Sequence, residues 1–186
     1  SFFAFTHTNH RMAATTKPLA VVLVDEGYED LEVHYPLLRL KEAGYHVEVA
    51  GNKVGHNFLS KHGYWATSTK LFSEITAADV KVLIVPGGWA PDRLRRWKDC
   101  LQLVADCNTA GAVIAHICHG GWVPISAKIM KGKKSTCFVA IKDDIINSGA
   151  EYSEDRVVVD GNMVSAQTPD DLPEFMKAVL AVAASK

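Results

Sequence analysis

Three short apolar runs, rich in β-branched residues, restrict the fold of this chain more than any other feature. They cover residues 19–24, 82–85 and 112–117, and each is followed by a turn rich in acidic, glycine or cysteine and histidine residues. Apolar runs of this length without alternation are typical of strands buried on both faces of a parallel sheet. Helical segments separate the runs. This alternation predicts one α/β domain over residues 18–186, a mostly parallel sheet with helices on both faces.

The remaining segments continue the same alternation. Gly44 is placed to end the first helix, and Pro91 is placed to begin the second, where a missing N–H is harmless. The last two strands are joined by a hairpin signal at residues 160–162. The predicted helices are 31–43, 91–110 and 173–183, and the further predicted strands are 46–50, 134–138, 157–160 and 163–166.

Charge and cysteine usage exclude several classes of protein. The 186 residues carry a formal net charge of −1, which excludes the strongly basic surface of a nucleic-acid-binding protein. No apolar run approaches the ~20 residues that a membrane helix needs. The four cysteines have no C-x-x-C spacing, so we expect reduced thiols and a cytoplasmic location. The chain is therefore predicted to have neither nucleic acid nor a membrane as a partner.

Residues 1–17 differ from the rest of the chain in composition. The first acidic residue is Asp25, and the opening segment contains three phenylalanines, two histidines and one arginine. We interpret it as a leader, a tag or a disordered extension outside the domain. If residues 1–16 are instead the remnant of a transit peptide, import into an organelle is the alternative location.

Cys118 lies directly after the run 112–117 and before a predicted helix. This strand–nucleophile–helix context is that of a nucleophile elbow, and Gly120 permits the close approach that such a turn needs. A helix N-terminus favours an anion, so we expect the pKa of the thiol to be lowered below ~8.5. His116 stands where the pattern usually has a small residue. The alternative is a structural cysteine in the core, as we expect for the other three, Cys100, Cys107 and Cys137.

His119 follows the cysteine and supplies a candidate base or orienting imidazolium. A metal site built from His116, Cys118 and His119 is the alternative, but it lacks a second ligand pair at zinc-like spacing. We therefore predict neither a metal nor a cofactor. Asp92, in the first turn of the second helix, is either the group that orients His119 or an ordinary helix-start acid.

Glu32 lies near the start of the first helix. If its carboxyl reaches the thiol, burial and the nearby negative charge should raise its pKa and keep it protonated, so that it acts as a general acid. Otherwise it complements the helix dipole, as its acidic neighbours do. Gly87 and Gly88 offer backbone N–H groups that, with the N–H of His119, form an oxyanion hole. The alternative for this pair of glycines is a simple turn.

Taken together and in order, these motifs resemble the ThiJ/PfpI family of the class I glutamine-amidotransferase-like superfamily, over residues 18–182. The PfpI-like subgroup, in which histidine follows the cysteine, is the most similar. The strings that carry the resemblance are residues 29–32, 35–36, 39–44, 61–64, 86–88, 90–93, 117–120, 141–144, 158–162 and 169–172.

The resemblance implies a flavodoxin-like three-layer sandwich in which Cys118 is the nucleophile and Glu32 contacts its thiol. It also implies that Asp92 orients His119, often across a subunit interface, although Asp92 is one methylene shorter than the usual glutamate. A homodimer, or a hexamer built from dimers, is the implied assembly.

The activities that the resemblance implies are glutathione-independent glyoxalase, deglycation, proteolysis and chaperone-like holding. We predict the first two: conversion of methylglyoxal to lactate, or attack on related aldehydes, through a hemithioacetal on Cys118. The alternatives are an intracellular cysteine peptidase of the PfpI type and a redox-sensing stress protein in which Glu32 stabilises oxidised Cys118. A vestigial site is a third alternative.

Overall fold

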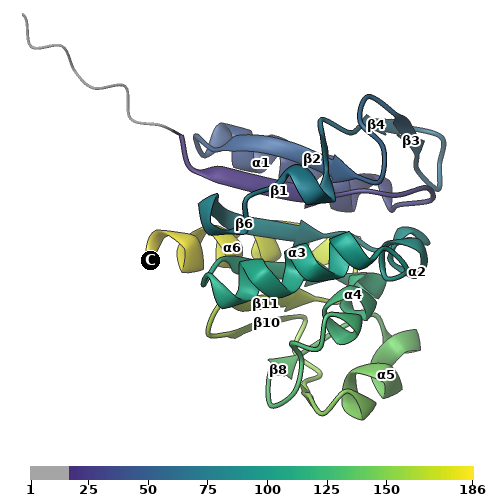
Figure 1. The fold of residues 1–186 in the computed structure, drawn as a ribbon. Helices are drawn as coiled ribbons and strands as arrows, with labels where there is room; N and C mark the ends of the chain where they lie inside the picture. The colour runs from purple at the N-terminus through teal and green to yellow at the C-terminus, as the bar shows by residue number, and fades with distance from the viewer. Residues whose placement is uncertain (1–16) are drawn as a thin grey trace, which may run out of the picture.

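A seven-stranded sheet forms the centre of the computed structural model, which describes residues 17–186 (Figure 1). The strand order is β10-β11-β7-β6-β1-β2-β5, and every neighbouring pair is parallel except the β10–β11 hairpin. The strands are β1 (Leu19–Leu23), β2 (His46–Gly51), β5 (Lys70–Leu71), β6 (Val80–Val85), β7 (Val113–Ile117), β10 (Val157–Asp160) and β11 (Met163–Ala166). The mostly parallel sheet is confirmed. The predicted extension at residues 1–17 lies, apart from Lys17, outside the described residues.

Helices cover both faces of this sheet, as the apolar runs predict. α1 and α6 pack against one face and against each other, and α3 covers the opposite face (Figure 1). The helices are α1 (Asp30–Glu42), α2 (Ala90–Leu94), α3 (Lys98–Thr109), α4 (Trp122–Ser126), α5 (Lys142–Asn147) and α6 (Leu172–Ala184). Strands β1, β6 and β7 are almost entirely buried between these layers. Within residues 17–186, no helix is both long and apolar enough to cross a membrane.

The predicted helix 91–110 is wrong as a single element. It divides into α2 and α3. The backbone N–H groups of residues 95–97 donate to carbonyls three or four residues earlier, which closes α2, and Trp97 is extended, which interrupts the helix before α3. The Trp97 indole N–H donates to Asp25 Oδ2 at 2.8 Å, at the end of β1. A contact across 72 residues therefore accompanies a break that no glycine or proline marks.

The predicted strand 134–138 is also wrong in its extent. Only β8 (Lys134–Ser135) is a strand, and it pairs with β9 (Glu151–Tyr152) outside the main sheet. The backbone of residues 136–138 leaves the strand ladder. Thr136 N donates to Ser165 Oγ at 3.0 Å, and Phe138 N donates to Cys118 O at 3.2 Å. A second small ladder, β3 (Asn57–Leu59) with β4 (Trp65–Thr67), lies in the long connection after β2.

The order of the strands places a ligand-binding edge beside β1. The chain passes from β1 to β2 on one side and then crosses to β6 on the other. In open α/β sheets such a reversal leaves a crevice at the carboxyl ends of the strands. The turns after β1, β6 and β7 therefore meet at one edge.

Candidate active site

Cys118 occupies the turn between β7 and α4. Its φ of +58° lies in the left-handed region, which is uncommon for a residue other than glycine and marks local strain. The turn needs Gly120, because a Cβ there would lie 2.5 Å from Val85 O. The single 3₁₀ turn Cys118–Gly121 separates the cysteine from α4. The local geometry is that of a nucleophile elbow.

Gly87 allows the Glu32 carboxyl, the Cys118 side chain and the backbone N–H of His119 to gather at the elbow. A Cβ at this position would lie 2.7 Å from Glu32 Oε2, 2.8 Å from Cys118 Cβ and 2.9 Å from the backbone nitrogen of His119. Real Cβ atoms do not approach other atoms so closely, so only glycine fits. Its backbone N–H donates to Glu32 Oε2 at 2.6 Å. The glycine after β6 is thus the point at which the turns of three strands converge.

Glu32 is the buried acid of the site. Its side chain has no exposed surface, and burial raises the pKa to about 8, against the lowering effect of the hydrogen bond from Gly87. Its Oε1 accepts no hydrogen bond from residues 17–186. At neutral pH the carboxyl is therefore mainly protonated, and it can donate its proton to a group in the site.

The Cys118 thiol is half-buried, and its pKa differs from the expectation. Burial and the neighbouring Glu32 carboxyl raise the pKa of Cys118 to about 12, against the backbone N–H groups of His119 and Gly88, which lower it. The expected lowering by the helix N-terminus is wrong for the resting site. The helix after the elbow begins as one 3₁₀ turn and is short, so its dipole does not outweigh burial. The thiol therefore needs a base before it can attack.

His119 is placed to act as that base. Its Nδ1 lies 3.3 Å from Cys118 Sγ. Burial, together with the positive charge of Lys61, lowers the pKa of His119 below its usual value. The imidazole is then neutral at pH 7 and able to accept the thiol proton.

Asp92 does not meet His119 within this chain. Its carboxylate is half exposed, in the first turn of α2, and forms an ion pair with Arg96. Gly88 does lie at the site, with a φ of +72° and its N–H toward the cysteine sulfur. Of the three N–H groups predicted to form an oxyanion hole, those of Gly88 and His119 lie at the thiol, whereas the Gly87 N–H donates to Glu32.

A cavity of about 290 Å³ opens in front of the thiol. It adds six residues that we did not single out as site residues from the sequence. Most lie inside or beside strings that carry the resemblance, which is the signal that points to them. They are Glu29, Lys61, Trp89, Phe138, Thr168 and Pro169. Lys61 brings a positive charge to the cavity wall, where it pairs with Glu29 at 3.0 Å.

The structure does not build a metal site from His116, Cys118 and His119. His116 is fully buried, and its Nε2 faces Ser135 Oγ at 3.2 Å. Within residues 17–186, the only set of three ligating side chains close enough to share an ion lies elsewhere: Glu29, Asp30 and His62. Cys100, Cys107 and Cys137 are fully buried, as expected of packing residues.

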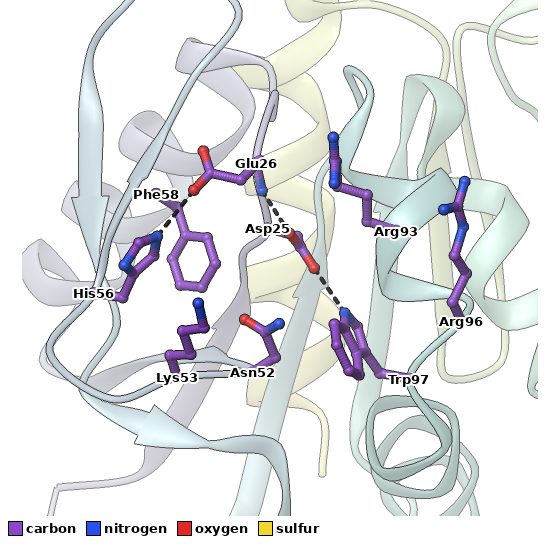
Figure 2. Close-up of a pocket in the computed structure, with 9 residues that line it drawn as sticks. All are labelled: Asp25, Glu26, Asn52, Lys53, His56, Phe58, Arg93, Arg96 and Trp97. Carbon is purple, nitrogen blue, oxygen red and sulfur yellow. Dashed lines mark hydrogen bonds and ion pairs between the residues drawn. The ribbon is translucent and has the colours of Figure 1, made fainter.

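A second cavity, of about 400 Å³, lies beyond the ends of β1 and β2 (Figure 2). Its polar groups bond to one another: Asp25 accepts from Trp97, and Glu26 Oε1 lies 2.9 Å from His56 Nε2. None of its lining residues is a cysteine. Cys118, Glu32 and His119 line the smaller cavity instead.

The family model for the DJ-1/PfpI family matches residues 19–182. The chain belongs to the DJ-1/PfpI family. Deglycase PfpI of Pyrococcus furiosus is 40% identical over 150 residues, which cover 81% of this chain and 90% of that protein. Protein/nucleic acid deglycase 2 of Escherichia coli K12 is 35% identical and covers 89% of this chain and 96% of its own. YraA of Bacillus subtilis 168, provisionally named a cysteine protease, is 35% identical over 89% of this chain and 97% of its own.

Solved structures support the same family assignment. A two-domain protein of Anabaena variabilis, with DJ-1/ThiJ/PfpI-like and ferritin-like domains, superposes with a TM-score of 0.87 at 33% identity. The match covers 89% of this chain and 48% of that one. A ThiJ/PfpI domain protein of Brachyspira murdochii has a TM-score of 0.84 at 25% identity, with 90% and 96% coverage. The flavodoxin-like sandwich expected from the resemblance is confirmed.

Proposed function

We propose that this DJ-1/PfpI protein is a cysteine-dependent enzyme for reactive aldehydes. Its reaction is a glutathione-independent conversion of methylglyoxal to lactate, or deglycation through the same first step. The observation that carries the proposal is the arrangement at the elbow: the protonated Glu32 carboxyl and the Cys118 side chain meet at Gly87, and the neutral His119 imidazole lies against the thiol. Relatives named deglycases support the same class of chemistry.

The first step forms a carbon–sulfur bond. The Cys118 thiol transfers its proton to His119 Nδ1 as sulfur attacks the aldehyde carbon. The N–H groups of Gly88 and His119 stabilise the charge that develops on the aldehyde oxygen, and this oxygen then takes a proton from Glu32. The product is a neutral hemithioacetal on the cysteine. The cavity in front of the thiol, about 290 Å³, suits a substrate of this size.

The second step moves hydrogen between adjacent carbons. The Glu32 carboxylate left by the first step removes the proton from the sulfur-bearing carbon, while the His119 imidazolium protonates the neighbouring carbonyl oxygen, which gives an enediol. Glu32 then returns the proton to the neighbouring carbon, and His119 takes the hydroxyl proton from the sulfur-bearing carbon, which becomes the thioester carbonyl. One carbon is oxidised and the other reduced, so no external oxidant enters. Water then cleaves the resulting thioester to release lactate and restore the thiol.

A self-association of the chain is part of this proposal. Asp92 is half exposed in the first turn of α2, and the exposed Trp89 just before this helix lines the cavity. In a homodimer, or a hexamer of dimers, Asp92 would leave its ion pair with Arg96 and contact His119 of a neighbouring subunit. It would then supply the carboxylate that orients the imidazole. Sedimentation of the wild type and of Asp92→Asn tests for the assembly.

The deciding assay supplies methylglyoxal without glutathione or metal and follows lactate. We expect Cys118→Ala to abolish turnover, and Glu32→Gln and His119→Ala to lower it by roughly 10²–10⁴-fold, the usual contribution of a proton-transfer group. Cys107→Ala is the matched control, since it removes a fully buried thiol on α3 that does not line the cavity. Wild-type protein with a reactive Cys118 but no lactate would exclude the glyoxalase activity.

Two alternative functions are each favoured by one observation. The similarity to YraA favours a peptidase, which the same preparation would reveal by cleaving a fluorogenic peptide. Cys118 is the one cysteine among residues 17–186 that is not fully buried, which favours selective oxidation in a redox sensor. A sensor would show Cys118 oxidation by peroxide that His119→Ala leaves unchanged.

A further inference from the structure

The orientation of the His119 ring decides whether it can take a proton from the thiol. Its Nδ1 lies 3.3 Å from Cys118 Sγ, and a half-turn about the Cβ–Cγ bond would place a carbon there instead. Where a histidine serves as base, a carboxylate on its far nitrogen commonly prevents that rotation. Within residues 17–186, no carboxylate is hydrogen-bonded or ion-paired to His119, and Asp92 is paired with Arg96 instead.

Two aromatic rings contact the imidazole in place of a carboxylate. The Trp122 ring meets it at a tilt of 62°, with 5.5 Å between the ring centroids. The Phe138 ring lies at 33° with a centroid distance of 5.0 Å. Both distances are within the range of favourable aromatic pairs. Phe138 is also tied to the elbow, since its backbone N–H donates to Cys118 O.

Trp122 is itself anchored at two points. Its indole N–H donates to Asp144 Oδ2 at 2.8 Å, which links the start of α4 to α5. The Arg95 guanidinium lies over the indole at 5.5 Å, and Arg95 Nε donates to Ser126 Oγ at 2.9 Å. An indole held at its N–H by Asp144 and over its ring by Arg95 has little freedom to move, so it can fix the position of a neighbouring side chain.

We propose that Trp122, anchored by Asp144 and Arg95, is the positioning residue that holds His119 with Nδ1 toward Cys118. This role of Trp122 rests on the proposed function, in which His119 takes the thiol proton. The contact between His119 Nδ1 and Cys118 Sγ is present without substrate, however, so the effect of Trp122 on it can be measured separately. Trp122 belongs to none of the strings that carry the family resemblance.

The test measures alkylation of Cys118 by iodoacetamide in the full chain between pH 5.5 and 9.5, with peptide mass spectrometry as the readout. The thiol is protonated at rest, so the rate in the wild-type protein near neutral pH should depend on His119 removing the proton as sulfur attacks the reagent. We expect Trp122→Ala to lower the rate at pH 7 about tenfold, the equivalent of one aromatic contact. Its pH profile should shift toward alkaline values and approach that of His119→Ala.

Variants of the anchor keep the proposal testable if Trp122→Ala does not fold. Trp122→Phe and Asp144→Ala remove the indole–carboxylate bond and should each lower the rate about threefold, the equivalent of a modest hydrogen bond. Asp144→Asn retains an acceptor for the indole and should restore the wild-type rate. Trp97→Phe is the matched control, because its indole also donates to an aspartate, Asp25, but lines the other cavity.

Wild-type rates and pH profiles in folded Trp122→Phe and Asp144→Ala would overturn the proposal. So would equal losses in these variants and in Trp97→Phe, which would indicate a general effect on stability. Alkylation needs no aldehyde substrate, so the two proposals fail separately. Absence of lactate in wild type refutes the glyoxalase activity and leaves the assignment of Trp122 to the alkylation result.

Discussion

Glu32→Gln should make the stability of this protein less sensitive to alkaline pH. The Glu32 pKa rises from its usual 4.5 to about 8 in the folded chain, because the carboxyl is fully buried. The folded state therefore holds a proton that the unfolded state releases. Its stabilising effect is complete below pH 4.5 and is lost as the pH rises through about 8.

The size of the effect follows from that interval. From 4.5 to about 8, at about 1.4 kcal/mol per pH unit, the free energy of unfolding falls by roughly 5 kcal/mol. For a chain of this size that corresponds to roughly 10–20 °C in melting temperature. Glutamine keeps an acceptor for Gly87 N–H and has no charge to bury, so the variant should not show this loss.

The assay is urea unfolding of wild type and Glu32→Gln at pH 5 and at pH 9. The difference between the two proteins should grow with pH, in favour of the variant. Glu48→Gln is the matched control. Burial raises the pKa of Glu48, but hydrogen bonds from Thr69 and His46 bring this pKa below its usual value, so its contribution is the same at pH 5 and pH 9 and the variant should keep the wild-type pH dependence. Equal losses of stability in wild type and Glu32→Gln would refute the view that Glu32 is held protonated by burial.

Two further substitutions test the packing around the elbow. Gly87→Ala should destabilise the fold by about 1–3 kcal/mol and abolish lactate formation, because the new Cβ collides with Glu32 and Cys118 while the backbone conformation itself is unstrained; wild-type melting and turnover would contradict this. Burial lowers the pKa of His116 from 6.5 to about 4, so the folded state resists a proton that the unfolded state accepts. Wild-type stability should then fall by roughly 3 kcal/mol as the pH drops from 6.5 to 4, and His116→Gln should remove that dependence in acid unfolding curves.

Much of the fold is readable from local patterns. Buried parallel strands need uninterrupted apolar runs, and the runs at 19–24, 82–85 and 112–117 fall on β1, β6 and β7. The turn at Cys118 is equally local, because glycine two residues on is what permits the close approach to Val85. The errors in the extent of residues 91–110 and 134–138 arise where backbone or side chains bond to distant residues, which periodicity does not record.

The sequence alone determined the class of fold and the candidate residues of the elbow, because both depend on residue types at short spacing. Tertiary structure decided how those residues interact. It left Asp92 with Arg96 and placed Trp122 and Phe138 on His119. It also raised the pKa of Cys118, because the thiol is buried beside a carboxyl that lies 86 positions earlier in the chain. Burial and contacts between distant segments exist only once the chain has folded, so no local pattern specifies them.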